Sequence, residues 1–265
     1  MGSVVGLFTY PIKGCAPVAL DDGELTPAGL RHDREFMVTG PDGVFRSQRR
    51  DPRLALIRPE VRGDELRLRA PGIEPVAVPV DTVGPRRSVR LFSADFLGID
   101  QGALAAEWLS TVLGVPSRLV RVPPEHDRVV SGATPGTSGW ADSAALHVLA
   151  ESSLADLNAR LAEPLPMARF RPNVVVDDVA GPYGEDRVQA AEVGTAAVAF
   201  CKPAIRCVVT VVDQETGVKT GKEPLRTLAG YRRHESGGVA FGAKFSVTRP
   251  GTLAVGDAFT VTAWA

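Results

Sequence analysis

The chain has 265 residues, a length typical of one or two domains. Its 30 basic and 31 acidic residues give a net charge of −1. This net charge is too small to attract nucleic acid or a membrane surface through the overall field of the protein. The hydrophobic content of 44% suffices for a sizeable core, and 27 glycines with 21 prolines favour a strand-rich fold over a helical bundle.

Four short apolar runs in the first third of the chain predict strands, because each is bounded by turn residues. They cover residues 4–10, 35–38, 54–57 and 65–69. The last two runs flank a Gly63-Asp64 turn, which predicts a β-hairpin. The next run, residues 76–80, contains Pro79 and therefore fits only an edge strand or a bulge.

The first helix is predicted over residues 101–113, where apolar side chains recur at helical spacing. Its apolar stripe consists of Leu104, Trp108, Val112 and Leu113. Gly114 follows at the place of a left-handed C-cap. Residues 123–139 are rich in Gly, Pro, Ser and Thr, so we expect a long loop that is mobile or ordered by a ligand.

A second helix is predicted after the apolar segment 146–149. Ser153 and Asp156 form a start like a capping box, and Pro164 ends the helix. Later apolar runs predict strands over residues 173–176, 195–200, 205–212 and 253–261. Strands outnumber helices and do not alternate with them, which disfavours a doubly wound parallel sheet and favours a barrel or a mixed α+β fold.

The three cysteines are too few for a disulfide framework and predict a reducing compartment. Residues 1–10 lack the basic and apolar regions of a signal peptide, and no apolar run reaches the roughly 20 residues of a membrane span. We therefore expect a cytoplasmic protein without a membrane span.

Common nucleotide-binding and hydrolase motifs are missing from the sequence. No two of its four histidines are spaced as in a multi-histidine zinc site, and His147, within an apolar run, is predicted to be structural. Cys207 directly follows Arg206, whose charge favours the thiolate that a metal ligand must be. A small buried core residue is the alternative, and the residues alone leave both interpretations open. Cys15 and Cys201 are predicted to be core residues.

Basic residues cluster beside turn-like segments. Such charges are usually solvated, but arginines next to Gly and Pro can instead cradle a phosphate, whose geometry the guanidinium group matches. The clustered residues are Lys13, Arg31, Arg34, Arg49, Arg50, Arg169 and Arg171.

Several blocks of the sequence, in order, resemble the MOSC family. The stretch 7–15 resembles the opening of the MOSC N-terminal beta-barrel domain, and 29–36 resembles a strand entry of that domain. Blocks similar to the MOSC domain proper are residues 151–158, 170–175, 206–217, 222–225, 250–251 and 255–257. The resemblance covers nearly the whole chain and points to the amidoxime-reducing components and the YcbX-type proteins within the family.

The resemblance implies an α+β, strand-rich fold. It would consist of a MOSC-type beta-barrel, an N-terminal beta-barrel-like domain and a few peripheral helices. The MOSC N-terminal beta-barrel domain would cover residues 1–120 and the MOSC domain residues 121–265. Unlike the YcbX-type proteins, the chain is expected to lack a ferredoxin-like domain, because it ends at Trp264-Ala265.

The resemblance also implies a molybdenum-cofactor site, in which Cys207 takes the position of the thiolate bound to molybdenum. A soft thiolate suits such a sulfur-rich centre. The other positions implied to bind the cofactor, or to lie beside it, are Lys13, Gly14, Arg34, Asp142, Ser143, Arg171, Asn173, Ile205, Arg206 and Lys244. Three of these depart from the family pattern: Gly14 replaces a serine, Ile205 a small polar residue and Lys244 a tyrosine of the animal proteins.

The function implied is a molybdenum-dependent oxidoreductase that reduces the N–O bond of small N-hydroxylated compounds, with Cys207 as catalytic and metal-binding residue. One alternative is a cofactor or sulfur carrier, in which Cys207 holds a persulfide or a passing cofactor without turnover. Another is a binding module with no redox role. Three cysteines cannot hold a four-thiolate iron–sulfur cluster and also supply a molybdenum ligand. A reductase of this sequence would therefore need a separate electron donor, a ferredoxin or a small haem protein with its reductase.

Overall fold

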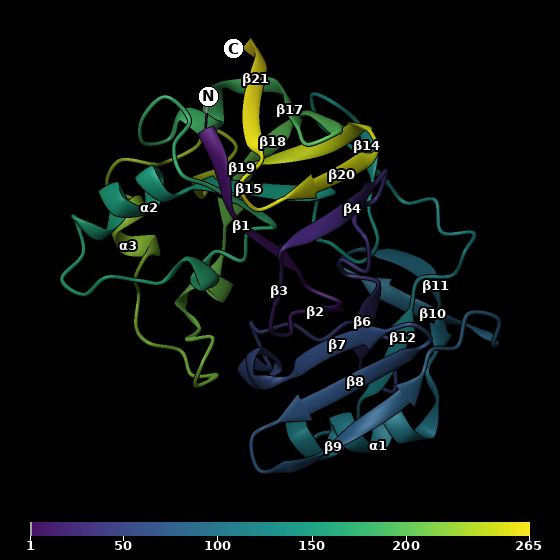
Figure 1. Cartoon of the computed structure of the whole chain (residues 1–265). Helices are drawn as coiled ribbons and strands as arrows, with labels where there is room; N and C mark the ends of the chain where they lie inside the picture. The colour runs from purple at the N-terminus through teal and green to yellow at the C-terminus, as the bar shows by residue number, and fades with distance from the viewer. Residues whose placement is uncertain (1) are drawn as a thin grey trace.

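The computed structural model describes residues 2–265, with 44% of residues in strands and 15% in helices. A closed seven-stranded barrel forms its centre, and an eighth strand extends the same sheet (Figure 1). In sheet order the strands are β16 (Val174–Val176), β15 (Leu146–Ala150), β19 (Val239–Arg249), β18 (Ala196–Arg206), β17 (Val188–Val193), β21 (Ala258–Trp264), β1 (Gly2–Thr9) and β3 (Val18–Leu20). The strand-rich barrel expected from the sequence is confirmed.

Strand β1 closes the barrel and places the N-terminal end of the chain beside the C-terminal strand. It pairs antiparallel with β16 on one side and with β21 on the other, and Figure 1 shows it beside the C-terminal strand. Val4 and Leu7 point into the barrel core, where Phe245 and Phe259 are also buried. Because β1 and β3 precede residue 120 and yet belong to the barrel sheet, the boundary between residues 1–120 and 121–265 stays a prediction.

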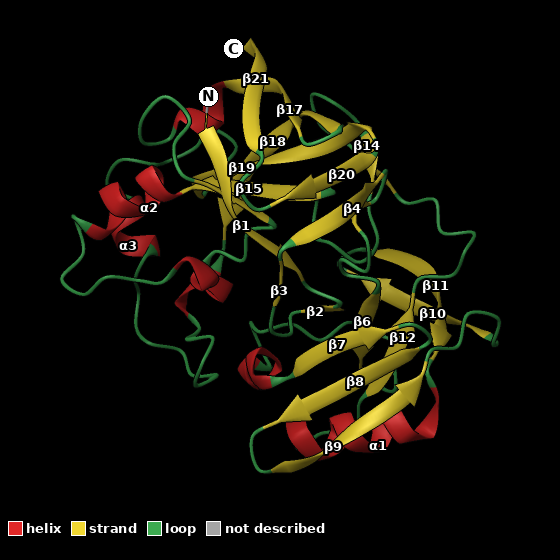
Figure 2. Ribbon diagram, viewed as in Figure 1, coloured by secondary structure: helices red, strands yellow, loops and turns green. Residues whose placement is uncertain are grey.

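The remaining strands of the first half form sheets beside the barrel (Figure 2). One sheet has the order β10 (Arg86–Leu91), β11 (Ala94–Asp100), β12 (Arg118–Arg121), β6 (Phe36–Thr39) and β2 (Ile12–Lys13). A meander consists of β7 (Arg58–Arg62), β8 (Glu65–Ala70) and β9 (Ile73–Pro79), and a third sheet of β20 (Gly251–Ala254), β4 (Asp22–Thr26) and β5 (Gly29–Leu30). The predicted edge strand around Pro79 is confirmed, since β9 pairs only with β8.

Three α-helices flank the sheets: α1 (Gly102–Leu113), α2 (Glu151–Asn158) and α3 (Leu225–Leu228). Helix α1 packs Trp108 and Leu109 into the same core as Leu66 and Leu68 of the meander. Gly114 ends α1 in the predicted left-handed conformation, with a φ of +73°. Within residues 2–265, no helix has the length and hydropathy that spanning a membrane requires.

Two apolar runs predicted as strands are 3-10 helices instead. The first is Pro52–Leu56, where Pro52 starts a tight turn that buries Leu54; the hairpin arm is β7, immediately after it. The second is Val208–Val211. There the Cys207 carbonyl accepts hydrogen bonds from the Thr210 N–H at 3.0 Å and from its hydroxyl at 2.9 Å, which turns the chain at the end of β18. The periodicity of a short apolar run does not by itself distinguish a strand from a 3-10 helix.

The details of the predicted helices need correction. Leu104 is exposed, because it lies in the first turn of α1 at the edge of the buried face, although Trp108, one turn later, is buried. Ser153 does not cap α2: it lies inside the helix, and its hydroxyl donates to Glu185 at 2.8 Å. Helix α2 ends at Asn158, well before Pro164.

The segment 123–139 is not one structureless loop, because it contains the paired strands β13 (Val129–Val130) and β14 (Gly136–Thr137). Its Arg128 side chain donates to the Gly139 carbonyl at 2.9 Å and to the Asp142 carbonyl at 3.0 Å. Protein contacts therefore order this segment. The barrel strands β17 and β19 have no counterpart among the predicted strands.

Candidate functional site

One cleft gathers all the predicted site positions. It has about 930 Å³ of empty space, part of it open to solvent, and its walls come from both the barrel and the N-terminal sheets. The predicted positions on its walls are Lys13, Gly14, Arg34, Asp142, Ser143, Arg171, Asn173, Ile205, Arg206, Cys207 and Lys244. Side chains far apart in sequence thus meet at one place, while their roles toward a ligand stay predictions.

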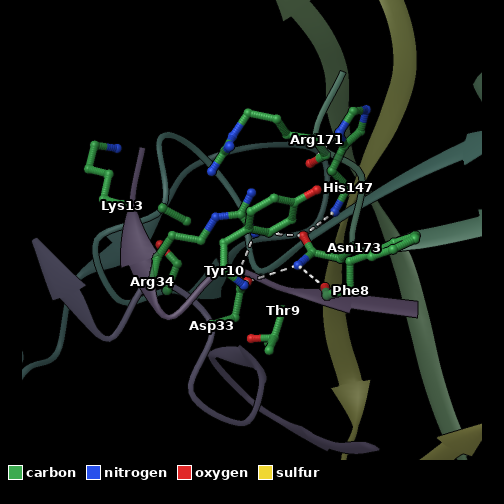
Figure 3. A network of polar contacts seen from close by, with 12 residues as sticks. Phe8, Thr9, Tyr10, Lys13, Asp33, Arg34, His147, Arg171 and Asn173 are labelled. Carbon is green, nitrogen blue, oxygen red and sulfur yellow. Dashed lines mark hydrogen bonds and ion pairs between the residues drawn. The ribbon is translucent and has the colours of Figure 1, made fainter. Parts of the chain in front are cut away.

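Arg34 is held at the cleft by a buried polar network (Figure 3). Its Nη1 donates to Asp33 Oδ2 at 2.6 Å and to Asn173 Oδ1 at 2.9 Å. Asp33 is itself fixed, because its Oδ1 accepts hydrogen bonds from the Tyr10 N–H at 2.9 Å and from Asn173 Nδ2 at 3.0 Å. A guanidinium restrained in this way keeps its remaining N–H groups in a defined position at the cleft.

Asn173 lines the cleft, but its amide already has protein partners. Besides the contact with Arg34, its oxygen accepts a hydrogen bond from the His147 N–H at 3.2 Å. Its nitrogen donates to Asp33 and, at 3.1 Å, to the Phe8 carbonyl. With 1% of its surface exposed, Asn173 acts here by orienting Arg34, so a direct cofactor contact through the amide remains only a prediction.

Arg171 is buried in the wall on the side of the N-terminal sheets. Its Nη2 donates to the Cys15 carbonyl at 2.7 Å, and its Nη1 donates to Gln214 Oε1 at 3.1 Å. Gln214 in turn exchanges two hydrogen bonds with Gln48, at 3.0 and 2.9 Å. Burial lowers the pKa of Arg171, yet guanidinium groups keep their proton in proteins, so the cleft holds a fixed cation here.

Arg34 and Arg171, the two arginines that turn segments bring to the cleft, both have a left-handed backbone conformation. The φ angle is +48° at Arg34 and +56° at Arg171. Such angles in residues other than glycine cost of order 1–3 kcal/mol each and persist where surrounding contacts determine them, typically at functional sites. The network around Asp33 and the hydrogen bond of Tyr10 Oη to the Pro172 carbonyl, at 3.0 Å, supply such contacts.

Asp142 lies between two lysines in the cleft. Its carboxylate forms an ion pair with Lys13, and Lys244 donates to the neighbouring Ser143 hydroxyl. Partial desolvation would raise the pKa of Asp142, whose side chain is 53% exposed, but the charges of Lys13 and Lys244 outweigh it and hold that pKa below its usual range. Burial lowers the pKa of Lys244 to about 8. One carboxylate therefore faces several cations, which leaves the cleft with an excess of positive charge.

His147, on β15, connects Arg171 and Arg206. Its Nδ1 lies 3.4 Å from the Arg171 carbonyl, and its Nε2 lies 3.5 Å from Arg206 Nη1. Burial first, and then the charge of Arg206, hold the pKa of His147 well below its usual value, so the imidazole is neutral. These contacts assign the proton to Nδ1, which donates to the carbonyl, while Nε2 accepts from Arg206. The structural role predicted for His147 thus includes supporting a residue of the cleft.

Gly242, on β19, leaves the space that this imidazole occupies. Its φ is +83°, and a Cβ atom there would lie 2.5 Å from His147 Nε2 and 2.9 Å from the Val148 carbonyl oxygen. We expect Gly242→Ala to lower the free energy of unfolding by about 1–3 kcal/mol, because it adds backbone strain and displaces the ring. Chemical denaturation measures this change. Gly72→Ala is the control, since that glycine also has positive φ but open space around it; equal losses in both variants would show that the ring contact is irrelevant.

Cys207 follows the end of β18 and is partly exposed on the cleft wall. Cys15 and Cys201 are buried, as predicted. Burial raises the pKa of the Cys15 thiol to about 12, so it stays protonated. Among the three cysteines, Cys207 is the one that lines the cleft.

Sequence reasoning missed several residues of the cleft. Phe45 and Phe92 lie under the Lys13 ammonium, whose nitrogen is 5.8 and 5.4 Å from their ring centroids. Arg49, one of the clustered basic residues but not one of the positions implied by the resemblance, also lines the cleft. A lone phenylalanine in a loop gives no periodic signal, and only the fold brings these rings to Lys13.

Known proteins match the chain over nearly its whole length. Residues 1–116 match the MOSC N-terminal beta barrel domain, and residues 135–260 match the MOSC domain. Mitochondrial amidoxime reducing component 2 of Rattus norvegicus is 34% identical over 97% of this chain and 82% of its own length. Mitochondrial amidoxime-reducing component 1 of Homo sapiens is 32% identical over the same shares. The solved structure of the YuaD protein from Bacillus subtilis covers 97% of this chain and 92% of its own, with 9% identity and a TM-score of 0.42.

Proposed function

The chain belongs to the MOSC family, together with the amidoxime-reducing components, and on this premise we propose that it binds the molybdenum cofactor and reduces N-hydroxylated compounds. The observation that carries the proposal is the convergence of Cys207 with the cationic side chains of Arg34, Arg171 and Arg206 in one cleft. A thiolate is the ligand that a soft, sulfur-rich metal centre takes, and guanidinium groups are suited to a phosphate.

The residues of the cleft fit this cofactor. The Arg206 guanidinium is buried enough to lower its pKa to about 10, and its Nε has no hydrogen-bond partner within residues 2–265. Its Nη2 is fixed by the Phe170 carbonyl at 2.8 Å. A buried donor without a partner is unfavourable unless a ligand or an ordered water supplies the acceptor. An anionic cofactor beside Cys207 would satisfy it.

Each group would have a distinct part in holding the cofactor. Cys207 would bind the metal, Arg34 and Arg171 the phosphate, and Arg206 an acceptor near the metal. Lys13 would contribute mainly through Asp142 and the loop beside it, because its ammonium is already bonded to Asp142 and, at 2.8 Å, to the Trp140 carbonyl. When bound, the cofactor supplies the two electrons that reduce the N–O bond.

The alternative in which the protein only carries the cofactor makes a different prediction about metal retention. Protein produced in a host that makes the cofactor should keep about one molybdenum per chain through gel filtration if it is a reductase, as expected for a resident cofactor. The same sample should reduce an amidoxime with a chemical electron donor. Molybdenum that exchanges during filtration, with no reduction of the amidoxime, would favour the carrier.

The source of electrons gives a further prediction. We expect molybdenum-loaded protein to reduce an amidoxime with reduced viologen but to be inactive with NADH alone, because the sequence has no dinucleotide-binding fingerprint. Anaerobic assays with each donor make the comparison, and a ferredoxin or a small haem protein with its reductase should restore NADH-dependent turnover. Rapid turnover by the isolated chain with NADH would mean that it contains a further cofactor site.

A further inference from the structure

The aromatic ring of Tyr10 lies against the two arginines proposed to hold the phosphate (Figure 3). The guanidinium carbon of Arg34 is 4.2 Å from the ring centroid, and that of Arg171 is 4.3 Å from it. Tyr10 itself is buried, with 1% of its surface exposed, and it directly follows β1. It does not line the cleft; the two arginines do.

Two like charges close to one ring need an explanation. Burial lowers the pKa of Arg171, and the charge of Arg34 lowers it further, so the pair is mutually repulsive. The negative face of an aromatic ring attracts a guanidinium, most strongly where water is excluded. The ring of Tyr10 therefore offsets the repulsion, in addition to the hydrogen bonds that hold each guanidinium group.

Hydrogen bonds tie Tyr10 to both segments that carry the arginines. Its carbonyl accepts from the Arg34 N–H at 2.8 Å, and its N–H donates to Asp33 at 2.9 Å. Its hydroxyl donates to the carbonyl of Pro172, the residue after Arg171, at 3.0 Å. These hydrogen bonds hold the phenol between the two left-handed turns that carry the arginines.

We propose that Tyr10 is a positioning residue, whose ring fixes the spacing of Arg34 and Arg171 so that the two form a preorganised phosphate clamp. The proposed clamp concerns this chain without its cofactor. Only the identification of the bound group as the phosphate of the cofactor rests on the proposed function. Preorganisation of this kind raises affinity by reducing the ordering that binding requires.

The test uses the full chain without cofactor and inorganic phosphate as the probe, measured by calorimetry. Tyr10→Phe keeps the ring and should bind phosphate within about twofold of the wild type, whereas Tyr10→Met fills similar space without a ring and should bind roughly tenfold more weakly. Tyr183→Met is the matched control. Tyr183 also stacks on an arginine, with the Arg232 guanidinium carbon 4.3 Å from its ring centroid, but this arginine, unlike Arg34 and Arg171, is not among the residues lining the cleft.

A second measurement follows the arginines directly. In nuclear magnetic resonance spectra, the Nε–H signals of Arg34 and Arg171 should carry a ring-current shift that Tyr10→Phe preserves and Tyr10→Met removes. The proposal is overturned if folded Tyr10→Met binds phosphate like the wild type, if Tyr10→Phe loses as much affinity as Tyr10→Met, or if the wild type binds no phosphate. Should Tyr10→Met fail to fold, Tyr10→Phe still decides, because a tenfold loss there would assign the role to the hydroxyl. None of these results depends on reductase activity, so a failure of the proposed function is recognised separately.

Discussion

Replacing Cys207 by alanine is expected to abolish both molybdenum retention and reduction of N-hydroxylated substrates, in a protein that stays folded. The side chain is partly exposed at the end of β18, so its truncation removes little packing and should change the free energy of unfolding by less than about 0.5 kcal/mol. Molybdenum per chain, amidoxime reduction with a chemical donor and thermal unfolding together measure the effect.

The other two cysteines provide the controls. Cys201, 1% exposed, packs with Val130 and Ala144, and Cys15 packs in the core beneath α1. Their replacement by alanine should destabilise the fold by about 1 kcal/mol, the usual size for such changes, and leave the metal content of the folded fraction near that of the wild type. Equal loss of metal in all three variants, or full activity in Cys207→Ala, would contradict the assignment of Cys207 as the ligand.

The sequence predicted the barrel class and several elements from local patterns. An apolar run stopped by Pro11 marked β1, and helical spacing with Gly114 marked α1 correctly. The patterns failed where a turn decided the structure. At Val208–Val211, the hydrogen bonds of Thr210 to the Cys207 carbonyl turn an apolar run into a 3-10 helix, and no periodicity reveals that contact.

The candidate site was predicted less by pattern than by resemblance. Spacing alone could not show that Lys13, Arg171 and Lys244 share a cleft, because β2 of the N-terminal sheet, β19 of the barrel and the turn at Arg171 meet only in the folded protein. The supporting residues Tyr10 and His147 were not predicted to have a role at the site. Each acts through contacts with an arginine that is distant in sequence, and such contacts leave no local signal.

Removing the cofactor anchors should lower affinity without removing the metal ligand. A hydrogen bond from a charged group contributes about 1.5–3 kcal/mol, so Arg34→Ala and Arg171→Ala should each weaken cofactor binding roughly 10- to 150-fold. The effect on molybdenum per chain should appear when the cofactor is limiting during expression and should diminish when it is abundant. Arg53→Ala is the control, because Arg53 is exposed and is not among the residues lining the cleft; Arg49 is unsuitable, since it lines the cleft.

Arg171→Ala should also reduce stability, for a different reason from Arg34→Ala. Its guanidinium donates to the Cys15 carbonyl and to Gln214, so truncation leaves buried acceptors without a donor, at about 1–3 kcal/mol for an unsatisfied group. Arg34→Ala removes the counter-charge of the buried Asp33 carboxylate, which keeps its two donors, from Tyr10 and Asn173, and this variant should also destabilise the fold. We therefore compare molybdenum per folded chain and measure unfolding on the same samples, so that a loss of stability is not taken for a loss of cofactor affinity. If both variants retain wild-type occupancy under limiting cofactor, the two arginines do not converge on the phosphate, and the excess positive charge of the cleft must serve another anion.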